Sequence, residues 1–355
     1  MGHPLSWPYN WAVIRHPMKT PIDRKPAPHA DQNGEATHPD LPQRELRAAL
    51  ESAVACSLEH YDLLLIHGED AQAFLQGQLT NDTLQTTQDR AQFGGYCSPN
   101  GRLLANFLLI STPEAYLLHL PSAITASFVE RLRKFVLRAR VHIEHAPDLF
   151  AVGLAGPKAA QGLNQIFGTL PARPLHVIRA DQSFAITLPG GLFLLMGPSA
   201  GIEAHRQQSL RDAVPATSQC WDWLQIQAGI PWILPPTRDQ FIPQMIGLDL
   251  LGGVGFQKGC YPGQEIVARS QYLGNIKRRL RSGHAFGPAS PGDPVLAAGK
   301  NCGMVLNAAP APNGGWDLLA VVQESEAVDP MHIGSMSGPH LTWNPALPFP
   351  APGGP

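Results

Sequence analysis

The chain has 355 residues, a length that accommodates two or three domains of ordinary size. Apolar residues make up 44% of it, enough for a sizeable core, and the 34 glycines and 35 prolines predict long loops and tails. The net charge of −2 excludes an overall basic field that would draw the chain to nucleic acid or to anionic lipid.

The first part of the chain predicts a leader without fixed structure, followed by a mixed α+β subdomain. Residues 1–45 are interrupted by proline and histidine without any sustained period, as is typical of disordered segments. Residues 46–145 carry both strand patterns and helical patterns. The predicted strands lie at 61–66, 95–97, 103–110 and 116–120, and the predicted helices at 71–76 and 128–141.

A second α+β subdomain is predicted over residues 146–275, and a small β-barrel over 276–330. The second subdomain should hold a strand at 150–154, a hairpin at 189–191, and helices at 157–167, 201–211 and 221–228. The short strand patterns at 277–284, 304–307 and 316–322 predict the barrel, and residues 331–355 read as a proline-rich tail. The order of the elements places the whole chain in the α+β class.

The five cysteines are spaced too widely for a disulfide framework or a structural zinc site. They stand at 56, 97, 220, 260 and 302, and no two of them form a C-x-x-C pair. We therefore expect free thiols in a reducing cytoplasm, with four of the five buried as small apolar side chains. No run approaches the roughly 18 apolar residues of a membrane-spanning helix, so no membrane association is expected.

The densest chemistry lies around Cys260, within an irregular stretch rich in proline, glycine and glutamine. Gly259 and Pro262-Gly263 favour a tight bend that can present the thiol outward. Lys258 or Arg269 beside the sulfur would favour the thiolate. Glu265 could accept a hydrogen bond from a ligand or pair with Lys258. The alternative reading is a tight turn with a buried cysteine and a structural Lys–Glu pair.

The segment Lys258-Gly259-Cys260-Tyr261-Pro262-Gly263-Gln264-Glu265 resembles the K-G-C-Y-x-G-Q-E signature of the YgfZ-type folate-binding proteins. These are relatives of the glycine-cleavage aminomethyltransferase that act in iron–sulfur cluster maturation. Three further stretches resemble family segments in the expected order: residues 74–82 (F-x-Q-G-Q-x-T-x-D), 97–103 (C-x-x-x-G-R-L) and 226–231 (I-Q-A-G-I-P). The resemblance covers about residues 50–325 and leaves both tails outside it.

This resemblance implies a cloverleaf of three subdomains around a bound tetrahydrofolate. It places the folate-lining aromatic residues at Tyr61 and Trp221, whose rings could stack on a flat heterocycle. It makes Cys260 the functional thiol in a motif loop with Lys258, Gly259, Tyr261, Gly263, Gln264, Glu265 and Arg269. Gln227 stands where the family has glutamate. The substitution removes a negative charge that could have contacted a pterin edge or clamped the backbone.

The implied role of Cys260 is either transient ligation of iron or a redox step with folate or a partner thiol. One cysteine does not hold a permanent cluster, so a partner would supply the other ligands. The implied partners are folate and iron–sulfur client enzymes or cluster-assembly proteins, with client enzymes that modify tRNA among them. Two basic stretches, 131–140 and 277–281, are read as solvated faces, although a folate tail or, less well supported, tRNA could contact them.

Aminomethyl transfer is not expected, because the acidic positions of that enzyme are occupied by Ala105 and Asn106 here. Two alternatives stay open at the level of sequence. One is a folate-dependent one-carbon transferase or demethylase of another kind. The other is an enzyme independent of folate, with Cys260 as nucleophile and His60, His67 or His284 as base.

Overall fold

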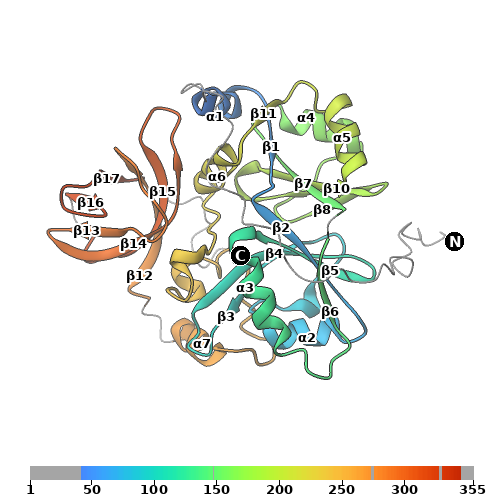
Figure 1. Ribbon diagram of the computed structural model, residues 1–355, viewed down its shortest axis with the longest axis horizontal. Helices are drawn as coiled ribbons and strands as arrows, with labels where there is room; N and C mark the ends of the chain where they lie inside the picture. Colours follow the sequence, from blue (N-terminus) through green and yellow to red (C-terminus); the bar gives the residue numbers. More distant parts are fainter. Residues whose placement is uncertain (1–40, 147, 273–275, 328–329, 345–355) are drawn as a thin grey trace. The chain divides into compact units, whose positions relative to one another are not determined.

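The computed structural model describes residues 41–146, 148–272, 276–327 and 330–344. From residue 42 onward, the described residues belong to one compact unit. The unit contains a five-stranded sheet, a six-stranded sheet and a closed six-stranded barrel, with helices between and beside them (Figure 1). The predicted α+β class and the C-terminal barrel are thus confirmed. Residues 1–40 of the leader predicted over 1–45, and residues 345–355 of the predicted tail, lie outside the described residues.

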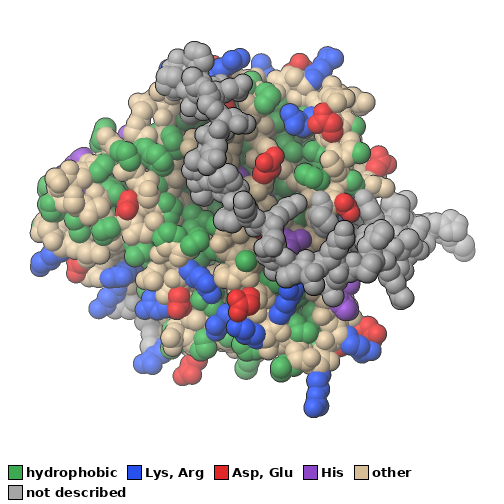
Figure 2. Space-filling view, viewed as in Figure 1, with side chains coloured by type: hydrophobic (Ala, Val, Ile, Leu, Met, Phe, Trp, Pro, Cys, Tyr) green, Lys and Arg blue, Asp and Glu red, His purple; other side chains and the backbone are tan. Residues whose placement is uncertain are grey.

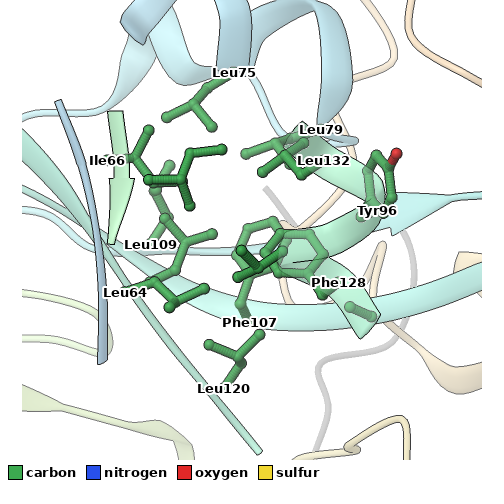
Figure 3. Close-up of a cluster of buried hydrophobic side chains, with 14 of the residues drawn as sticks. Leu64, Ile66, Leu75, Leu79, Tyr96, Phe107, Leu109, Leu120, Phe128 and Leu132 are labelled. Atoms are coloured by element: carbon green, nitrogen blue, oxygen red, sulfur yellow. The ribbon is translucent and has the colours of Figure 1, made fainter. Parts of the chain in front are cut away.

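The five-stranded sheet has the order β3-β4-β5-β2-β6 and is antiparallel throughout. Its strands are β2 (Tyr61–His67), β3 (Gln92–Cys97), β4 (Leu103–Ser111), β5 (Ala115–Pro121) and β6 (His142–His145). Helices α2 (Ala71–Gln78) and α3 (Ser122–Arg133) pack on it. Figure 3 shows their shared core, in which leucine side chains of both helices meet aromatic and aliphatic residues of the strands.

The six-stranded sheet has the order β11-β1-β7-β10-β9-β8. It comprises β1 (Val54–Ser57), β7 (Leu149–Ala155), β8 (Val177–Ala180), β9 (Ser183–Thr187), β10 (Phe193–Pro198) and β11 (Val214–Ala216). Helices α4 (Ala159–Phe167) and α5 (Ser199–Gln208) contribute Leu163 and Ile202 to its apolar core. Helix α6 (Ser218–Gln227) follows β11 and packs on both β1 and the barrel strands β14 and β15.

The barrel closes in the order β12-β15-β14-β13-β16-β17. Its strands are β12 (Arg278–Ala285), β13 (Pro294–Ala297), β14 (Lys300–Pro310), β15 (Trp316–Gln323), β16 (Met331–Ile333) and β17 (His340–Trp343). Between α6 and β12 the chain has mainly irregular structure. That stretch includes the short 3-10 helices η4 (Pro235–Thr237) and η5 (Pro243–Ile246), and then α7 (Gln264–Tyr272). This is the stretch that holds the motif loop.

The structure corrects three predicted boundaries. Helix α1 (Leu41–Glu51) begins inside the predicted leader, because Leu46 and Ala49 are buried and Glu45 binds Thr217. The boundary at 145 does not separate the two sheets, since β1 joins the six-stranded one. The barrel runs past residue 330 into the predicted tail. Its last two strands have only three and four residues, too few to show an alternating pattern.

The helix predicted over 128–141 also ends earlier, at Arg133. Residues 134–138 continue as turns, and Leu137 adopts a left-handed φ of 46°, which lies outside the α-helical region. Val136 and Ala139 still pack against the core, which explains why their spacing resembles a continued helix face. Within the described part of the chain, no helix is long and apolar enough to cross a membrane.

Candidate functional site

Cys260 is the exposed thiol of this chain. Cys56, Cys97, Cys220 and Cys302 are buried, and all five cysteines are free. This matches the expectation of one presented thiol and four internal ones. Burial raises the pKa of Cys97 to about 12. That thiol is therefore protonated and unreactive at neutral pH.

Lys258 anchors the motif loop to the C-terminal end of α2. Its Nζ donates to the carbonyl oxygens of Gln76 and Leu79, each at 2.6 Å, and to that of Asn81 at 3.0 Å. Carbonyl groups at the end of a helix lack partners within the helix, so a lysine satisfies them well. Burial lowers the pKa of Lys258 to about 8, against the opposing effect of Asp82.

This geometry bears on one of the two roles left open for Glu265, a pair with Lys258. Glu265 is exposed in the first turn of α7, and among the described residues no ion pair joins it to Lys258. The ammonium group is committed to backbone oxygens, so its primary role is structural. Arg269 is likewise exposed, in the last turn of α7. The predicted contribution of either cation to thiolate formation stays a prediction.

The second anchor of the loop is a close approach between backbones. A Cβ on Gly263 would lie 2.5 Å from the carbonyl oxygen of Ser98 and 2.6 Å from the Cα of Gly101. A Cβ on Gly101 would in turn lie 2.8 Å from the Cβ of Ile266 in α7. Both glycines have left-handed φ values, +80° and +69°. The loop therefore rests on the β3–β4 hairpin turn at a distance that side chains would prevent.

Two further contacts complete the loop's frame. Thr80 accepts the backbone N–H of Gly95 in β3 and donates to the carbonyl oxygen of Gly253, while its own carbonyl accepts from Gly255. Gln76 ties Thr83 and Asp82 together, which folds the turn after α2. The three stretches that resemble family segments at 74–82, 97–103 and 258–265 are thus one assembly in space.

The remaining motif residues support the bend from within. Tyr261 is buried, and its ring centroid lies 5.1 Å from the Nζ of Lys258. Gln264 donates to the carbonyl oxygen of Lys258 at 3.3 Å, which closes the loop on itself. Gly259 is exposed, and a Cβ built there meets no atom within 4 Å. The motif therefore divides into residues that fix the bend and a thiol that the bend presents.

A second constellation surrounds Tyr61, at the start of β2. Its hydroxyl donates to Oε1 of Gln225 at 2.7 Å, and Trp232 Nε1 donates to the same oxygen at 3.0 Å. The Tyr61 ring stacks on His119, with centroids 4.5 Å apart, and meets Trp232 edge-on at 5.3 Å. His60 packs on the other side at 4.5 Å and contacts Asp222 at 3.2 Å. We call His60, Tyr61, His119, Gln225 and Trp232 the Tyr61 cluster.

Buried polar atoms without a hydrogen-bond partner gather in and beside this cluster. They are His60 Nδ1, His119 Nδ1, Gln225 Nε2 and Trp221 Nε1. Leaving such a group unpaired costs about 1–3 kcal/mol. Burial, with a smaller contribution from His60, lowers the pKa of His119 to about 3, so its ring is neutral. His119, Gln225 and Trp221 therefore offer neutral hydrogen-bonding groups that a polar heterocycle could satisfy.

Trp221 lies one helical turn before Gln225 on α6 and is fully buried. Its ring covers Gly153 of β7, where a Cβ would come within 2.4 Å of Cε3. The stacking roles predicted for Trp221 and Tyr61 stay predictions. The structure does bring their neighbourhoods together, because α6 supplies both Trp221 and the acceptor of the Tyr61 hydroxyl.

Gln227 does not point into the Tyr61 cluster. It donates to Asp317 of the barrel at 2.9 Å, and Trp223 donates to the same carboxylate oxygen at 2.8 Å. His284 Nδ1 lies 2.8 Å from the other oxygen. Asp317 of β15 thus joins α6 to the barrel through two side chains, Trp223 and Gln227, while His284 of β12 holds it within the barrel. A glutamate at 227 would bring a second carboxylate against Asp317.

Asn106 is buried, and its side chain hydrogen-bonds to the backbone of another segment. Its Nδ2 donates to the carbonyl oxygen of Pro231 at 2.8 Å, and its Oδ1 accepts from the N–H of Ile233 at 2.7 Å. It thereby holds the segment that carries Trp232. Trp232 also contacts Phe93 of β3, with centroids 6.4 Å apart. Since Gly95 of the same strand binds Thr80, β3 links the Tyr61 cluster to the frame of the motif loop.

Several cations of the two basic stretches have local partners. Lys134 pairs with Glu130, Arg140 with Glu69 and Asp70, and Arg133 donates to the carbonyl of Ile143. Arg281 lies over the Trp343 ring at 4.9 Å. Figure 2 shows basic and acidic side chains interspersed on the face in view. These observations agree with the reading of both stretches as solvated faces.

Comparisons with known proteins agree with the assembled segments. A family model described as the GCVT N-terminal domain matches residues 24–181. The tRNA-modifying protein YgfZ of Sodalis glossinidius (strain morsitans) is 32% identical over 302 residues, 82% of this chain and 92% of the relative. The chain belongs to the YgfZ family. The YgfZ of Colwellia psychrerythraea is also 32% identical, over 66% of this chain and 72% of the relative.

The YgfZ fold is that of the aminomethyltransferases. The glycine cleavage system aminomethyltransferase T from Bartonella henselae superposes with a TM-score of 0.72, over 88% of this chain and 90% of its own. Its sequence identity is only 16%, so this likeness concerns the fold. The resemblance to the YgfZ type and the aminomethyltransferase-like fold expected from the sequence are both confirmed.

The sequence analysis missed three members of the Tyr61 cluster: His119, Gln225 and Trp232. Gln225 had a signal, because it stands four residues after Trp221 on a predicted helix and therefore on the same face. Trp232 follows directly on the I-Q-A-G-I-P segment. His119 had none, since a histidine within an apolar strand pattern is usually a core residue. Only the pairing of β2 with β5, which sets Leu63 opposite His119, brings it near Tyr61.

Proposed function

We propose that this chain binds a tetrahydrofolate and uses Cys260 to support assembly or repair of iron–sulfur clusters in client enzymes, tRNA-modifying ones among them. The observation that carries the proposal is the exposed thiol on a loop held by Lys258 and Gly263. Two curated relatives bear the name tRNA-modifying protein, which supports the link to tRNA modification. The free thiols support a cytoplasmic location.

The Tyr61 cluster fits a reduced pteridine chemically. A pteridine is flat and carries both donors and acceptors along its edge, whereas the cluster offers aromatic faces and unpaired neutral polar atoms. Tyr61 and Trp221 would hold the ring, Gln225 would donate from Nε2, and the two histidines would donate or accept according to tautomer. The bound folate would supply either a one-carbon unit or a redox-active ring.

Cys260 would act as a transient ligand of cluster iron or as a thiol in exchange with a partner. Thiolate is the preferred soft ligand for iron, and four ligands are normally needed for a cluster. Among the described residues, no group of three His, Cys, Asp or Glu side chains is placed to hold a metal. The partner, an iron–sulfur client enzyme or a cluster-assembly protein, would therefore supply the remaining ligands.

Aminomethyl transfer is not part of the proposal. That chemistry needs a carboxylate near the developing positive charge, and the two amide ends of Asn106 are occupied by backbone partners. Ala105 offers no polar group. The cations of the basic stretch 131–140 that have local partners give no support to direct tRNA binding, so the proposed link to tRNA runs through client enzymes.

Folate binding is tested by calorimetric titration of the full chain with tetrahydrofolate under anaerobic conditions. We expect saturable 1:1 binding, weakened about tenfold or more by Gln225→Leu, which removes the Nε2 donor and the shared acceptor. Gln207→Leu, on the exposed face of α5, serves as the matched control. An absence of heat and of Trp fluorescence change in the wild type would overturn the folate assignment.

The role of the thiol is tested in a bacterial strain that lacks its own YgfZ. The wild-type chain should restore the activity of an iron–sulfur enzyme that declines in that strain. Cys260→Ala should keep the melting temperature, because the side chain is exposed, yet fail to restore activity. Cys302→Ala is the control at a buried cysteine of the barrel. Restoration by Cys260→Ala would remove the thiol from the mechanism.

A further inference from the structure

Two of the buried cysteines lie together. Cys56 of β1 is fully buried, Cys220 of α6 is 1% exposed, and the Cys220 thiol is the largest of the influences that raise the pKa of Cys56. By contrast, the thiol of Cys302 donates to the carbonyl oxygen of Val295. The pair joins two elements that are far apart in the sequence but packed on each other in the fold.

The strand register explains this proximity independently. Cys56 stands opposite Gly153 of β7 on one side and Ala216 of β11 on the other. The ring of Trp221 covers Gly153, and Cys220 is the residue before Trp221. Cys220 also follows Ala216 by only four residues and lies at the start of α6. The register therefore places the Cys56 side chain on the face of the sheet that α6 covers, next to Cys220 and Trp221.

We infer that Cys56 and Cys220 are a disulfide-forming pair that a peroxide oxidises. Hydrogen peroxide accepts two electrons from the two thiols, its O–O bond breaks, and the two S–H bonds are replaced by one S–S bond. The two protons leave in water, so each pair consumes one peroxide and yields two water molecules. A disulfide needs the Cα atoms about 4.4–6.8 Å apart. Cys56 is paired with Ala216, four residues before Cys220, and α6 packs on β1, so the two cysteines are neighbours in the fold.

A disulfide between these residues would restrain α6. The bond would tie the first turn of that helix to β1, directly before Trp221 and one turn before Gln225. The neighbouring Cys220 thiol and burial raise the pKa of Cys56, so the pair reacts slowly and stays reduced unless the oxidant persists. Sustained exposure to peroxide would thus form the bond and make α6, the helix that supplies Gln225 to the Tyr61 cluster, more rigid. This inference does not depend on the proposed function.

The test uses the full chain with Cys260→Ser, so that the exposed thiol does not react. After prolonged incubation with hydrogen peroxide at pH 8.5, denatured protein is titrated for free thiols and digested without reduction. We expect four thiols to fall to two, and a peptide that links residues 56 and 220. Dithiothreitol should restore all four. The oxidised form should melt roughly 5 °C higher, because the bond closes a long loop.

Matched variants keep the test decisive. Cys56→Ala or Cys220→Ala should abolish both the linked peptide and the melting shift, whereas Cys302→Ala, also buried, should keep both. Two single variants guard against a folding defect in either one. Four remaining thiols after oxidation, sulfinic acid at either position, or a link that involves Cys97 or Cys302 would overturn the inference.

Discussion

Gly263 lies against Gly101 so closely that no side chain fits between them. A Cβ on Gly263 would come within 2.6 Å of both the backbone nitrogen and the Cα of Gly101. One glycine belongs to the motif loop and the other to the β3–β4 hairpin turn. The two sequence stretches that carry the family resemblance therefore meet at a single backbone contact, and that contact sets where Cys260 emerges.

Replacing Gly263 with alanine should disrupt this contact and destabilise the fold. The new Cβ meets backbone atoms that cannot move aside cheaply, and the residue must keep a φ of +80°. We expect a loss of about 2–4 kcal/mol in the free energy of unfolding, measured by urea denaturation. Gly259→Ala is the matched control, since its Cβ meets nothing within 4 Å. Equal stability of the two variants would contradict the structural role of the contact.

Lys258→Met tests the clamp on α2. The variant leaves three carbonyl groups without the ammonium donor, and we expect a loss of about 2–4 kcal/mol. Iodoacetamide should also modify Cys260 at a changed rate, because the loop that presents it is released. Lys277→Met, at an exposed lysine, should match the wild type in both measurements.

The same variant has a pH signature. The pKa of Lys258 is about 8 in the fold and 10.5 for an ordinary lysine, so the unfolded chain binds more protons between these values. Stability therefore gains from this group as the pH rises from 8 to 10.5, and the gain is absent below 8. The difference between wild type and Lys258→Met should grow across that window. A constant difference would mean that the lysine is not buried as the structure has it.

The strands and helices were largely predictable because they alternate or repeat strongly. The hairpin at Ser98–Gly101 and the helix that carries Trp221 follow from local pattern alone. The role of Lys258 did not, since its partners are backbone oxygens far away in the sequence, and no periodicity reports on them. The Tyr61 cluster depends in the same way on strand pairing, which brings His119 beside Tyr61 only after the sheet forms.

Gln227→Glu introduces the residue that the family has at this position, yet it should lower the free energy of unfolding. The new carboxylate would face Asp317, which already accepts from Gln227 at 2.9 Å. Because residue 227 is exposed, we expect a modest loss of about 1 kcal/mol at pH 7. Adding Asp317→Asn to Gln227→Glu should recover part of it. If the single variant is as stable as the wild type, the charge at 227 does not matter to the docking of α6 on the barrel.

His119 should shape the acid side of the stability curve. Its pKa is about 3 in the fold and 6.5 in an unfolded chain, so the unfolded chain takes up the proton first as the pH falls. The stability that the neutral ring contributes is full above pH 6.5 and declines between 6.5 and 3. From pH 7 to pH 5 this amounts to about 2 kcal/mol. In His119→Asn that decline should be missing, whereas His145→Asn, on the exposed edge strand, should keep the wild-type slope. Urea titrations at pH 7, 6 and 5 measure the slope, and parallel curves for wild type and His119→Asn would show that His119 is solvated in the native protein.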